Sequence, residues 1–321
     1  MLPKVSIIIP VFNCSAFLEK SLEVVMLQTY VNIEIIIVDD ESTDDSFIIA
    51  KKFESDNCIV IQQKNAGAAV ARNTGLKIAS GFYIQFLDAD DYLSVDKIEM
   101  QVSALVGRVN EIAVCSYVSF ENDDEIVSLK AIDQSPFIYS SMSPTDFLIN
   151  LFGGNGTDCN FVQTNCWLVP RSVIDKSGPW RNYRCPDDDG EFFTRVLLAS
   201  EGIVFVPDIL NFYRRKFNEY KLSSNLNKKY VQNTLLTIDL KYQYLKAKLT
   251  SSKLNKAFAK QYLDFAVYNY PLNIVFSNIA FKRYEQLNQK VVLPLLGGKW
   301  IEMSKRIFGW RIIRLLKHYF L

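Results

Sequence analysis

At 321 residues the chain is long enough for one large domain plus an extension. Hydrophobic residues make up 49% of it and charged residues 22%, which excludes a mainly disordered protein. The 36 Lys and Arg residues nearly cancel the 35 Asp and Glu residues, so the net charge gives no reason to expect nucleic acid as a partner.

The N-terminal part alternates short β-branched runs with stretches of helical periodicity. The expected strands are 5–10, 33–38, 59–62 and 82–87, and the expected helices are 15–28, 44–53 and 67–79. Strands that alternate with helices predict an α/β fold with a mostly parallel sheet flanked by helices. In such folds ligands bind beyond the carboxyl ends of the strands.

The second half of the chain changes character. Further strands are expected at 111–120 and 161–170, and after about residue 225 the pattern becomes one of helices rich in Lys, Tyr and Leu. We therefore place a domain boundary near residue 222, followed by a helical extension.

Cysteine and histidine usage narrows the chemistry. The six cysteines form no C-x-x-C pair, so we expect reduced, mostly buried thiols. The N-terminus resembles a first strand more than a signal peptide, and we expect a cytosolic protein. The only histidine, His318, lies near the C-terminus, which excludes a Ser-His-Asp triad and a His-rich zinc site in the main domain. Any catalysis must therefore use carboxylates, backbone dipoles and a hard metal ion.

Asp88, Asp90 and Asp91 directly follow the expected strand 82–87. Three carboxylates at one strand end repel one another unless a cation offsets their charge. A Mn²⁺ or Mg²⁺ ion that is also bound to phosphate oxygens meets this requirement. The alternative is a solvated acidic turn that caps the following helix.

Asp39 and Asp40 end an earlier strand in the same way. A carboxylate there can accept a hydrogen bond from a pyrimidine base, or these residues simply begin the next helix. Asn65 precedes the third expected helix and Gly67 begins it, and a glycine-started helix is the plainer interpretation. The common mononucleotide and dinucleotide motifs are absent from the sequence.

A fourth polar cluster opens an apolar helical stretch and contains Asp187, Asp188, Asp189 and Glu191. The helix dipole favours acidic residues in a first turn, so a purely structural role is one interpretation. The dipole does not require so many carboxylates, which indicates a catalytic base or an acceptor site.

Taken in this order, the four clusters resemble the family 2 glycosyltransferases with a GT-A fold, over about residues 3–216. The segments that carry the resemblance are 5–13 (VSIIIPVFN), 34–44 (EIIIVDDESTD), 65–75 (NAGAAVARNTG), 86–91 (FLDADD), 188–195 (DDGEFFTR) and 210–214 (LNFYR). The resemblance makes residues 1–222 a GT-A catalytic domain and leaves 223–321 as the helical extension.

The resemblance also implies roles for individual residues. Asp40 accepts a hydrogen bond from the nucleotide base, and Asp39 supports the loop. Arg72 holds the diphosphate and the acidic loop in place. The D-x-D positions Asp88 and Asp90 are the metal ligands. The full set of expected nucleotide-sugar-binding residues is Pro10, Val11, Asn13, Asp39, Asp40, Asn65, Gly67, Arg72, Asp88, Ala89 and Arg214.

For the reaction itself, the resemblance places the catalytic base at Asp189. Trp167, Asp188 and Glu191 are expected on the acceptor side, and Glu191 is the second candidate for the base. A histidine that often follows the L-x-x-Y-R element of the family is missing after Arg214, which puts diphosphate contacts from that loop in doubt.

These residues imply an inverting glycosyltransferase that moves one sugar from a nucleoside-diphosphate sugar, with a UDP-sugar as the expected donor. The acceptor is a glycan or a lipid-linked molecule in cell-surface polysaccharide synthesis. The Q-x-x-R-W motif and membrane spans of processive relatives are missing, which favours single-sugar transfer. The alternative is a non-catalytic nucleotide- or partner-binding module on the same fold. Retention of all four clusters argues against it.

The C-terminal tail has a distinct composition. From Lys299 to Leu321 there are six Lys or Arg residues and one acid, Glu302, interleaved with Trp, Ile and Leu at helical spacing. This pattern is typical of a helix that lies on an anionic membrane surface. The alternative is a helix packed on the catalytic domain with a solvated basic face. Membrane attachment makes the expected location the cytoplasmic face of a membrane.

Overall fold

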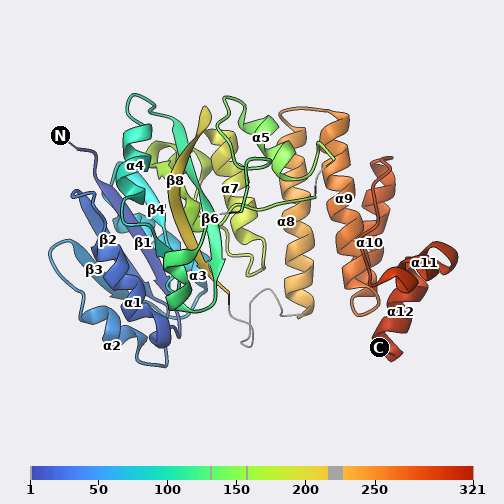
Figure 1. The fold of residues 1–321 in the computed structure, drawn as a ribbon, viewed down its shortest axis with the longest axis horizontal. Coiled ribbons are helices and arrows are strands. Elements are labelled where there is room, and N and C mark those ends of the chain that lie inside the picture. The colour runs from blue at the N-terminus through green and yellow to red at the C-terminus, as the bar shows by residue number, and fades with distance from the viewer. Residues whose placement is uncertain (1, 131, 157, 216–226, 321) are drawn as a thin grey trace. The chain divides into compact units, whose positions relative to one another are not determined.

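The computed structural model describes residues 2–130, 132–156, 158–215 and 227–320 (Figure 1). The chain divides into two compact units. The first comprises Met1–Pro144, Val162–Arg184 and Phe192–Lys221, and the second comprises Thr145–Phe161, Cys185–Glu191 and Leu222–Leu321. The two internal segments of the second unit were not expected from the sequence, because no change in composition marks them.

The first unit contains one sheet of eight strands in the order β3-β2-β1-β4-β7-β6-β8-β5. The strands are β1 (Val5–Val11), β2 (Ile33–Asp39), β3 (Cys58–Gln62), β4 (Tyr83–Phe86), β5 (Tyr92–Leu93), β6 (Glu111–Phe120), β7 (Trp167–Pro170) and β8 (Gly202–Arg214). Its helices are α1 (Ser15–Met26), α2 (Ser46–Lys51), α3 (Ala68–Ile78), α4 (Lys97–Ala104) and α6 (Arg171–Ser177), with 3₁₀ turns η1 (Asp123–Ser128) and η2 (Thr164–Cys166).

The parallel half of the sheet consists of β3, β2, β1 and β4. Strands β1 and β2 are runs of Val and Ile that are buried along nearly their whole length, as expected for parallel strands covered on both faces. Gly75 lets α3 lie close to β1, because a Cβ atom there would come within 2.4 Å of Cγ2 of Ile8. This packing fixes where the carboxyl ends of the strands lie.

The other half of the sheet is mixed. Strand β7 is antiparallel to both β4 and β6, β5 is antiparallel to β8, and β6 is parallel to β8. The expected strand at 111–120 coincides with β6, whereas the strand expected at 161–170 is present only as β7 and follows the 3₁₀ turn η2. The first residues of the expected strand instead lead into this turn, whose Asn165 side chain bonds to the distant Asp91.

The second unit is helical, as expected for the C-terminal extension. Its helices are α5 (Pro144–Leu151), α8 (Lys228–Lys246), α9 (Ser252–Asn269), α10 (Ile274–Gln286), α11 (Lys299–Phe308) and α12 (Trp310–Phe320). Helices α8, α9 and α10 lie side by side (Figure 1). Helix α7 (Asp188–Ala199) begins in this unit and continues along the chain into the first. No helix in the described part of the chain combines the length and apolarity needed to span a bilayer.

Candidate active site

The polar clusters of the first unit lie where the order of the parallel strands changes direction. Strand β1 has β2 on one side and β4 on the other. Asn13 follows β1, Asp39 and Asp40 end β2, and Asp88 follows β4. Sheets of this type bind ligands at such a switch point, because the loops leave the sheet in opposite directions there.

Asp40 holds the segment that leads into α3. Its Oδ1 atom accepts hydrogen bonds from Nε2 of Gln63 (2.7 Å) and the backbone N–H of Ala66 (2.9 Å), and its Oδ2 atom accepts from the N–H of Gly67 (2.7 Å). Gly67 has a φ of +96°, a conformation that other residues rarely adopt. The carboxylate therefore shapes this loop, and its contact with a base stays a prediction.

Asn13 and Asp39 hold the neighbouring loop. Asn13, itself left-handed with a φ of 48°, accepts from the backbone N–H of Thr43 at 2.8 Å, and its own N–H donates to Oγ of Ser42 at 3.0 Å. The fully buried Asp39 accepts from the N–H of Ser42 at 3.1 Å, which matches a loop-supporting role. These bonds join the ends of β1 and β2 into one edge.

Three further residues of the expected nucleotide-sugar-binding set, Pro10, Val11 and Asn65, differ in how exposed they are. Pro10 is half-buried and Asn65 is exposed, with Nδ2 of Asn65 donating to the carbonyl oxygen of Asp40 at 3.0 Å. Val11 is 1% exposed, and its expected place in the lining of the nucleoside pocket stays a prediction. Only its backbone reaches the edge, where its carbonyl oxygen accepts from the N–H of Asp40.

Residues 88–91, the acid loop, contain three carboxylates in different surroundings. Asp88 keeps 29% of its side-chain exposure, Asp90 is partly exposed, and Asp91 is completely buried. Burial, and then the charges of Asp90 and Asp88, raise the pKa of Asp91 well above its ordinary value. Ala89 is buried, and its expected contact with the nucleotide sugar stays a prediction.

The acid loop meets the chemical requirements of a hard divalent cation. Its carboxylates concentrate negative charge at one place, and Asp88 and Asp90 are the two that remain partly accessible. Among the described residues, no cluster of three or more His, Cys, Asp or Glu side chains is arranged to hold a metal. A cation at Asp88 and Asp90 would therefore need phosphate oxygens or water as its other ligands, the arrangement that Mg²⁺ commonly adopts.

Arg72 contacts the acid loop from α3. Its Nη2 atom lies 2.7 Å from Oδ1 of Asp88, and its guanidinium stacks on the ring of Trp180 at 4.5 Å. Asn73 holds Trp180 in turn, through paired hydrogen bonds of 2.8 and 2.9 Å with its backbone. The guanidinium is thus fixed in direction, while its expected contact with a diphosphate stays a prediction.

Arg214 lies behind the acid loop and is only 6% exposed. Its guanidinium donates to the carbonyl oxygen of Asp90 (3.0 Å), the hydroxyl of Tyr92 (2.5 Å) and Oδ1 of Asp123 (2.5 Å). Its backbone N–H donates to Oδ1 of Asp91 at 2.8 Å. These donors bind the protein itself, and the expected contact of Arg214 with a phosphate stays a prediction.

Asn165, which sequence reasoning missed, completes the support of the acid loop. Its Nδ2 atom donates to Oδ2 of Asp91 at 2.7 Å, and its Oδ1 atom accepts from the N–H of Asp88 at 3.1 Å. No signal in the sequence identifies it, because the contact joins residues more than seventy positions apart. Together with Arg214 it leaves Asp88 and Asp90 as the accessible carboxylates.

The second unit contains the acidic cluster at the start of α7. Asp187 accepts from Nζ of Lys241 at 2.8 Å and from Oγ1 of Thr237 at 2.8 Å. Glu191 is completely buried and accepts from the hydroxyl of Tyr244 at 2.8 Å. Two of the four carboxylates are therefore bonded to side chains of α8.

The other two carboxylates of this cluster, Asp188 and Asp189, are partly exposed. Asp189 accepts from the N–H of Gly190 at 2.8 Å, and Asp188 accepts from the N–H of Asp189 at 2.9 Å. Two of the residues expected on the acceptor side are buried, and their role there stays a prediction. Glu191 is 0% exposed, and Trp167, in the first unit, is 1% exposed and stacks on Phe193 at 5.5 Å.

A mixed sheet with partly parallel strands, an acidic loop after β4 and loops held by buried aspartates after β2 defines a class of protein, the nucleotide-sugar-dependent glycosyltransferases with a GT-A fold. The family described as Glycosyl transferase family 2 matches residues 6–178. The chain belongs to this family and is a glycosyltransferase.

Several relatives are similar in sequence. The Escherichia coli UDP-Glc:alpha-D-GlcNAc-diphosphoundecaprenol beta-1,3-glucosyltransferase WfaP is 50% identical over 191 residues, which is 57% of this chain and 75% of that protein. Glycosyltransferase GlyG of Streptococcus pneumoniae serotype 4 is 30% identical over 66% of this chain and 71% of its own length. Glycosyltransferase GlyA of the same organism is 33% identical, but the match spans only 30% of that protein.

Solved structures support the fold. S. aureus TarS 1–349 in complex with UDP-GlcNAc superposes with a TM-score of 0.70 at 18% identity, covering 98% of this chain and 91% of that one. The mannosyltransferase PcManGT from Pyrobaculum calidifontis, in complex with GDP-Man and Mn²⁺, gives a TM-score of 0.55 at 14% identity, covering 100% of this chain and 88% of that one. At these identities the likeness concerns the fold alone.

Proposed function

We propose that the protein is an inverting glycosyltransferase that moves one sugar from a UDP-sugar to a glycan or lipid-linked acceptor in cell-surface polysaccharide synthesis. The observation that carries the proposal is the acid loop, whose buried side is held by Asn165 and Arg214 while Asp88 and Asp90 stay accessible. The names of the relatives support the finer statements, since WfaP is named for a UDP-Glc donor and a diphosphoundecaprenol-linked acceptor.

In the proposed reaction an acceptor hydroxyl displaces the nucleoside diphosphate in a single step, which inverts the anomeric carbon. Asp189 accepts the proton of that hydroxyl, because it is the partly exposed carboxylate at the family's base position. Asp88 and Asp90 would hold a Mn²⁺ or Mg²⁺ ion, which supplies positive charge to the departing diphosphate. Arg72 keeps Asp88 in place through their 2.7 Å ion pair.

The second candidate function is a non-catalytic nucleotide- or partner-binding module on the same fold. Such a module has no use for a base, so it predicts that Asp189 can be replaced without loss. The enzyme and the module are therefore distinguished by turnover and by binding measured on the same variant.

The test is a transfer assay with a panel of UDP-sugars, lipid-linked acceptors and Mn²⁺. We expect one donor to raise the melting temperature by mass action and to be consumed with release of UDP. The anomeric configuration of the product, read by NMR, must be opposite to that of the donor. Retention of configuration, or donor binding without any turnover on any acceptor, would count against this proposal.

We also propose that the protein works on the cytoplasmic face of a membrane, attached peripherally through its C-terminal tail to an anionic lipid surface. The tail contains six Lys or Arg residues and one acid between Lys299 and Leu321. Attachment there would bring the enzyme to a lipid-linked acceptor.

A further inference from the structure

The C-terminal helical hairpin, formed by α11 and α12, leaves several large apolar side chains exposed. Trp300 and Ile307 of α11 are 79% and 71% exposed. The exposed apolar side chains that define this surface, here called the hairpin face, are Trp300, Ile307, Phe308, Ile312, Leu316 and Phe320. Isolated exposed hydrophobic residues are common, but a gathering of this size on two short helices marks an interaction surface.

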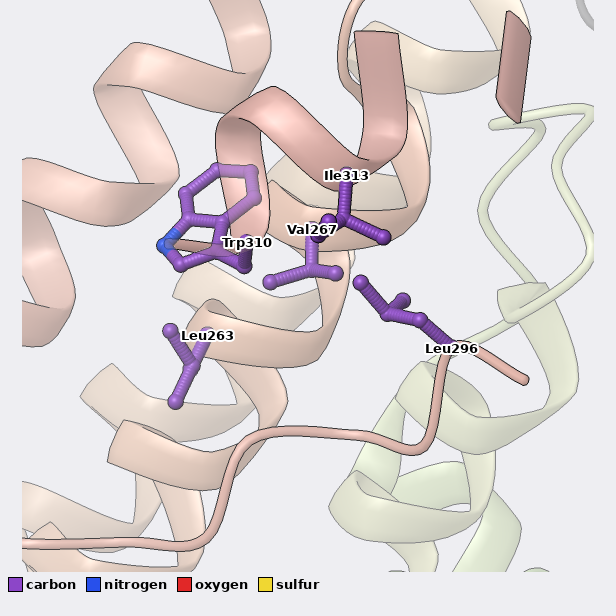
Figure 2. Close-up of a cluster of buried hydrophobic side chains, with 5 residues drawn as sticks. All are labelled: Leu263, Val267, Leu296, Trp310 and Ile313. Carbon is purple, nitrogen blue, oxygen red and sulfur yellow. The ribbon is translucent and has the colours of Figure 1, made fainter. Parts of the chain in front are cut away.

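The direction of the hairpin face is fixed by the packing on its other side. Trp310 and Ile313 of α12 pack against Leu263 and Val267 of α9 and against Leu296 (Figure 2). The ring of Trp310 also meets Tyr270 and Phe281 with ring centroids 5.5 and 5.8 Å away. Positions on an α-helix advance by about 100° per residue. Ile312 is therefore about 160° round the helix from Trp310 and about 100° from Ile313, and its side chain points away from the core. Leu316 is only about 60° from Ile313, so it lies at the edge of the outer side, where it is 45% exposed.

The basic residues of the hairpin explain why the apolar side is the outer one. Nζ of Lys305, the guanidinium of Arg314 and Nζ of Lys317 all donate to backbone carbonyl oxygens of the second unit, at 2.6 to 3.0 Å. Lys305 also pairs with Glu302. The inner side of the hairpin is thus a mixture of apolar packing and cations that are bonded to backbone carbonyl groups.

The remaining charges identify the occupant of the hairpin face. Lys299 and Arg306 of α11 are exposed, and the single acid of the tail, Glu302, is already paired with Lys305. Arg311 is exposed too, but its guanidinium donates to Oδ1 of Asn278 at 3.2 Å and lies over the ring of Trp310. A symmetric contact with a second copy would bring these cations together, which costs free energy. Anionic lipid head groups complement the same cations, and the acyl boundary accepts exposed Trp, Ile and Phe side chains.

We infer that the hairpin face inserts into the interface of an anionic membrane, with Trp300, Ile307 and Leu316 as apolar anchors and the exposed cations on the head groups. The inference deepens the proposed function and rests on it in one respect, the presence of a lipid-linked acceptor in the same membrane. Insertion of the apolar face, and not charge alone, is what holds the protein there.

The experiment uses flotation of the full chain with vesicles of phosphatidylcholine and phosphatidylglycerol in equal parts. We expect Ile307→Glu combined with Leu316→Glu to lower the partition coefficient at least about tenfold. The matched control is Val31→Glu, which changes an 81% exposed valine in the first unit and should leave flotation unchanged. The emission of Trp300 should shift to the blue on binding, because Trp167, Trp180 and Trp310 are already buried.

Equal flotation of the wild type and the double variant overturns the inference, and so does an absence of wild-type flotation. A wild-type dimer that the double variant dissociates would assign the face to a second copy. Melting temperature, and its rise with a bound UDP-sugar, show whether the double variant is folded.

If vesicle binding depends on the hairpin face but no transfer occurs in any assay, the proposed function fails while this inference stands. If transfer to a detergent-solubilised acceptor occurs but the protein does not bind vesicles, the proposed transfer reaction stands and this inference fails.

Discussion

Lys241 and Asp187 form an ion pair within the second unit, with Nζ of the lysine 2.7 Å from Oδ2 of the aspartate. The lysine side chain is 5% exposed. Burial alone lowers the pKa of Lys241, but the Asp187 carboxylate outweighs it, so the pKa lies above its ordinary value. Because Asp187 directly precedes α7, this pair ties helix α8 to the segment that contains Asp189.

Replacing Lys241 should therefore loosen that segment. We expect Lys241→Met to lower the free energy of unfolding by about 3 kcal/mol, the low end for a broken buried pair. Turnover should fall between about tenfold and a hundredfold, since small displacements of a catalytic group have effects of that size. Lys241→Arg should recover part of both losses, and Lys246→Met, at an exposed position of the same helix, is the control. Unfolding in urea and steady-state kinetics measure the two effects. Full turnover in Lys241→Met would show that the pair does not position the base.

Asp189→Asn should lower turnover by at least about a hundredfold while the affinity for the UDP-sugar stays nearly unchanged. The substitution removes a proton acceptor and preserves shape. Glu191→Gln is the matched comparison, because Glu191 is completely buried and bonds to Tyr244. It should lower the melting temperature and keep most of the turnover. The assignment of the base is wrong if the two variants show the opposite pattern.

Asp90→Asn should abolish most transfer without unfolding the protein, because Asp90 is partly exposed whereas Asp91 carries the hydrogen bonds that hold the loop. EDTA should have the same effect on the wild type, and added Mn²⁺ or Mg²⁺ should reverse it. Transfer rates and melting temperatures before and after chelation are the measurements. Undiminished transfer in EDTA would contradict a metal at the acid loop.

Glu34 predicts a measurable pH dependence of stability. Burial raises the pKa of Glu34, but hydrogen bonds from Lys4 and Ser6, with others from Ser80, outweigh burial and lower it from 4.5 to about 2. A lowered pKa in the folded state contributes stability above the unfolded value, and this contribution is lost as the pH falls from about 4.5 to 2. The free-energy difference between wild type and Glu34→Gln should therefore be smaller at pH 3 than at pH 7, by an amount on the order of 1 kcal/mol after solvent screening. Urea unfolding at both pH values checks this. A difference that does not shrink, with Glu23→Gln as the exposed control, refutes it.

The parallel half of the fold could be predicted because its strands are buried on both faces. Runs such as 33–38 then contain only Val and Ile apart from one acid, and the polar residues that follow must lie at the carboxyl ends. The place of Asp88 and Asp90 after β4 could be predicted in this way, whereas their role as metal ligands stays a prediction.

The supports of the acid loop could not be predicted, because they depend on contacts between distant residues. Asn165 lies in a 3₁₀ turn at a place where the residue pattern predicts a strand. The sequence does not show that the guanidinium of Arg214 lies over an aromatic ring. The hairpin shows the same limit. Periodicity predicts that α12 has two faces, but only the packing of Trp310 and Ile313 decides which of them is outside.

The hydrogen bonds that hold the acid loop from its buried side have a consequence for how donor preference can change. Asn165 and Arg214 fix the loop through Asp91 and the backbone of Asp90, without using the accessible carboxylates. The residues that face a sugar can therefore diverge between relatives, or be exchanged in the laboratory, while the geometry of Asp88 and Asp90 is kept. Engineering of new donor specificity should begin on the open side of the loop and leave Asn165, Asp91 and Arg214 untouched.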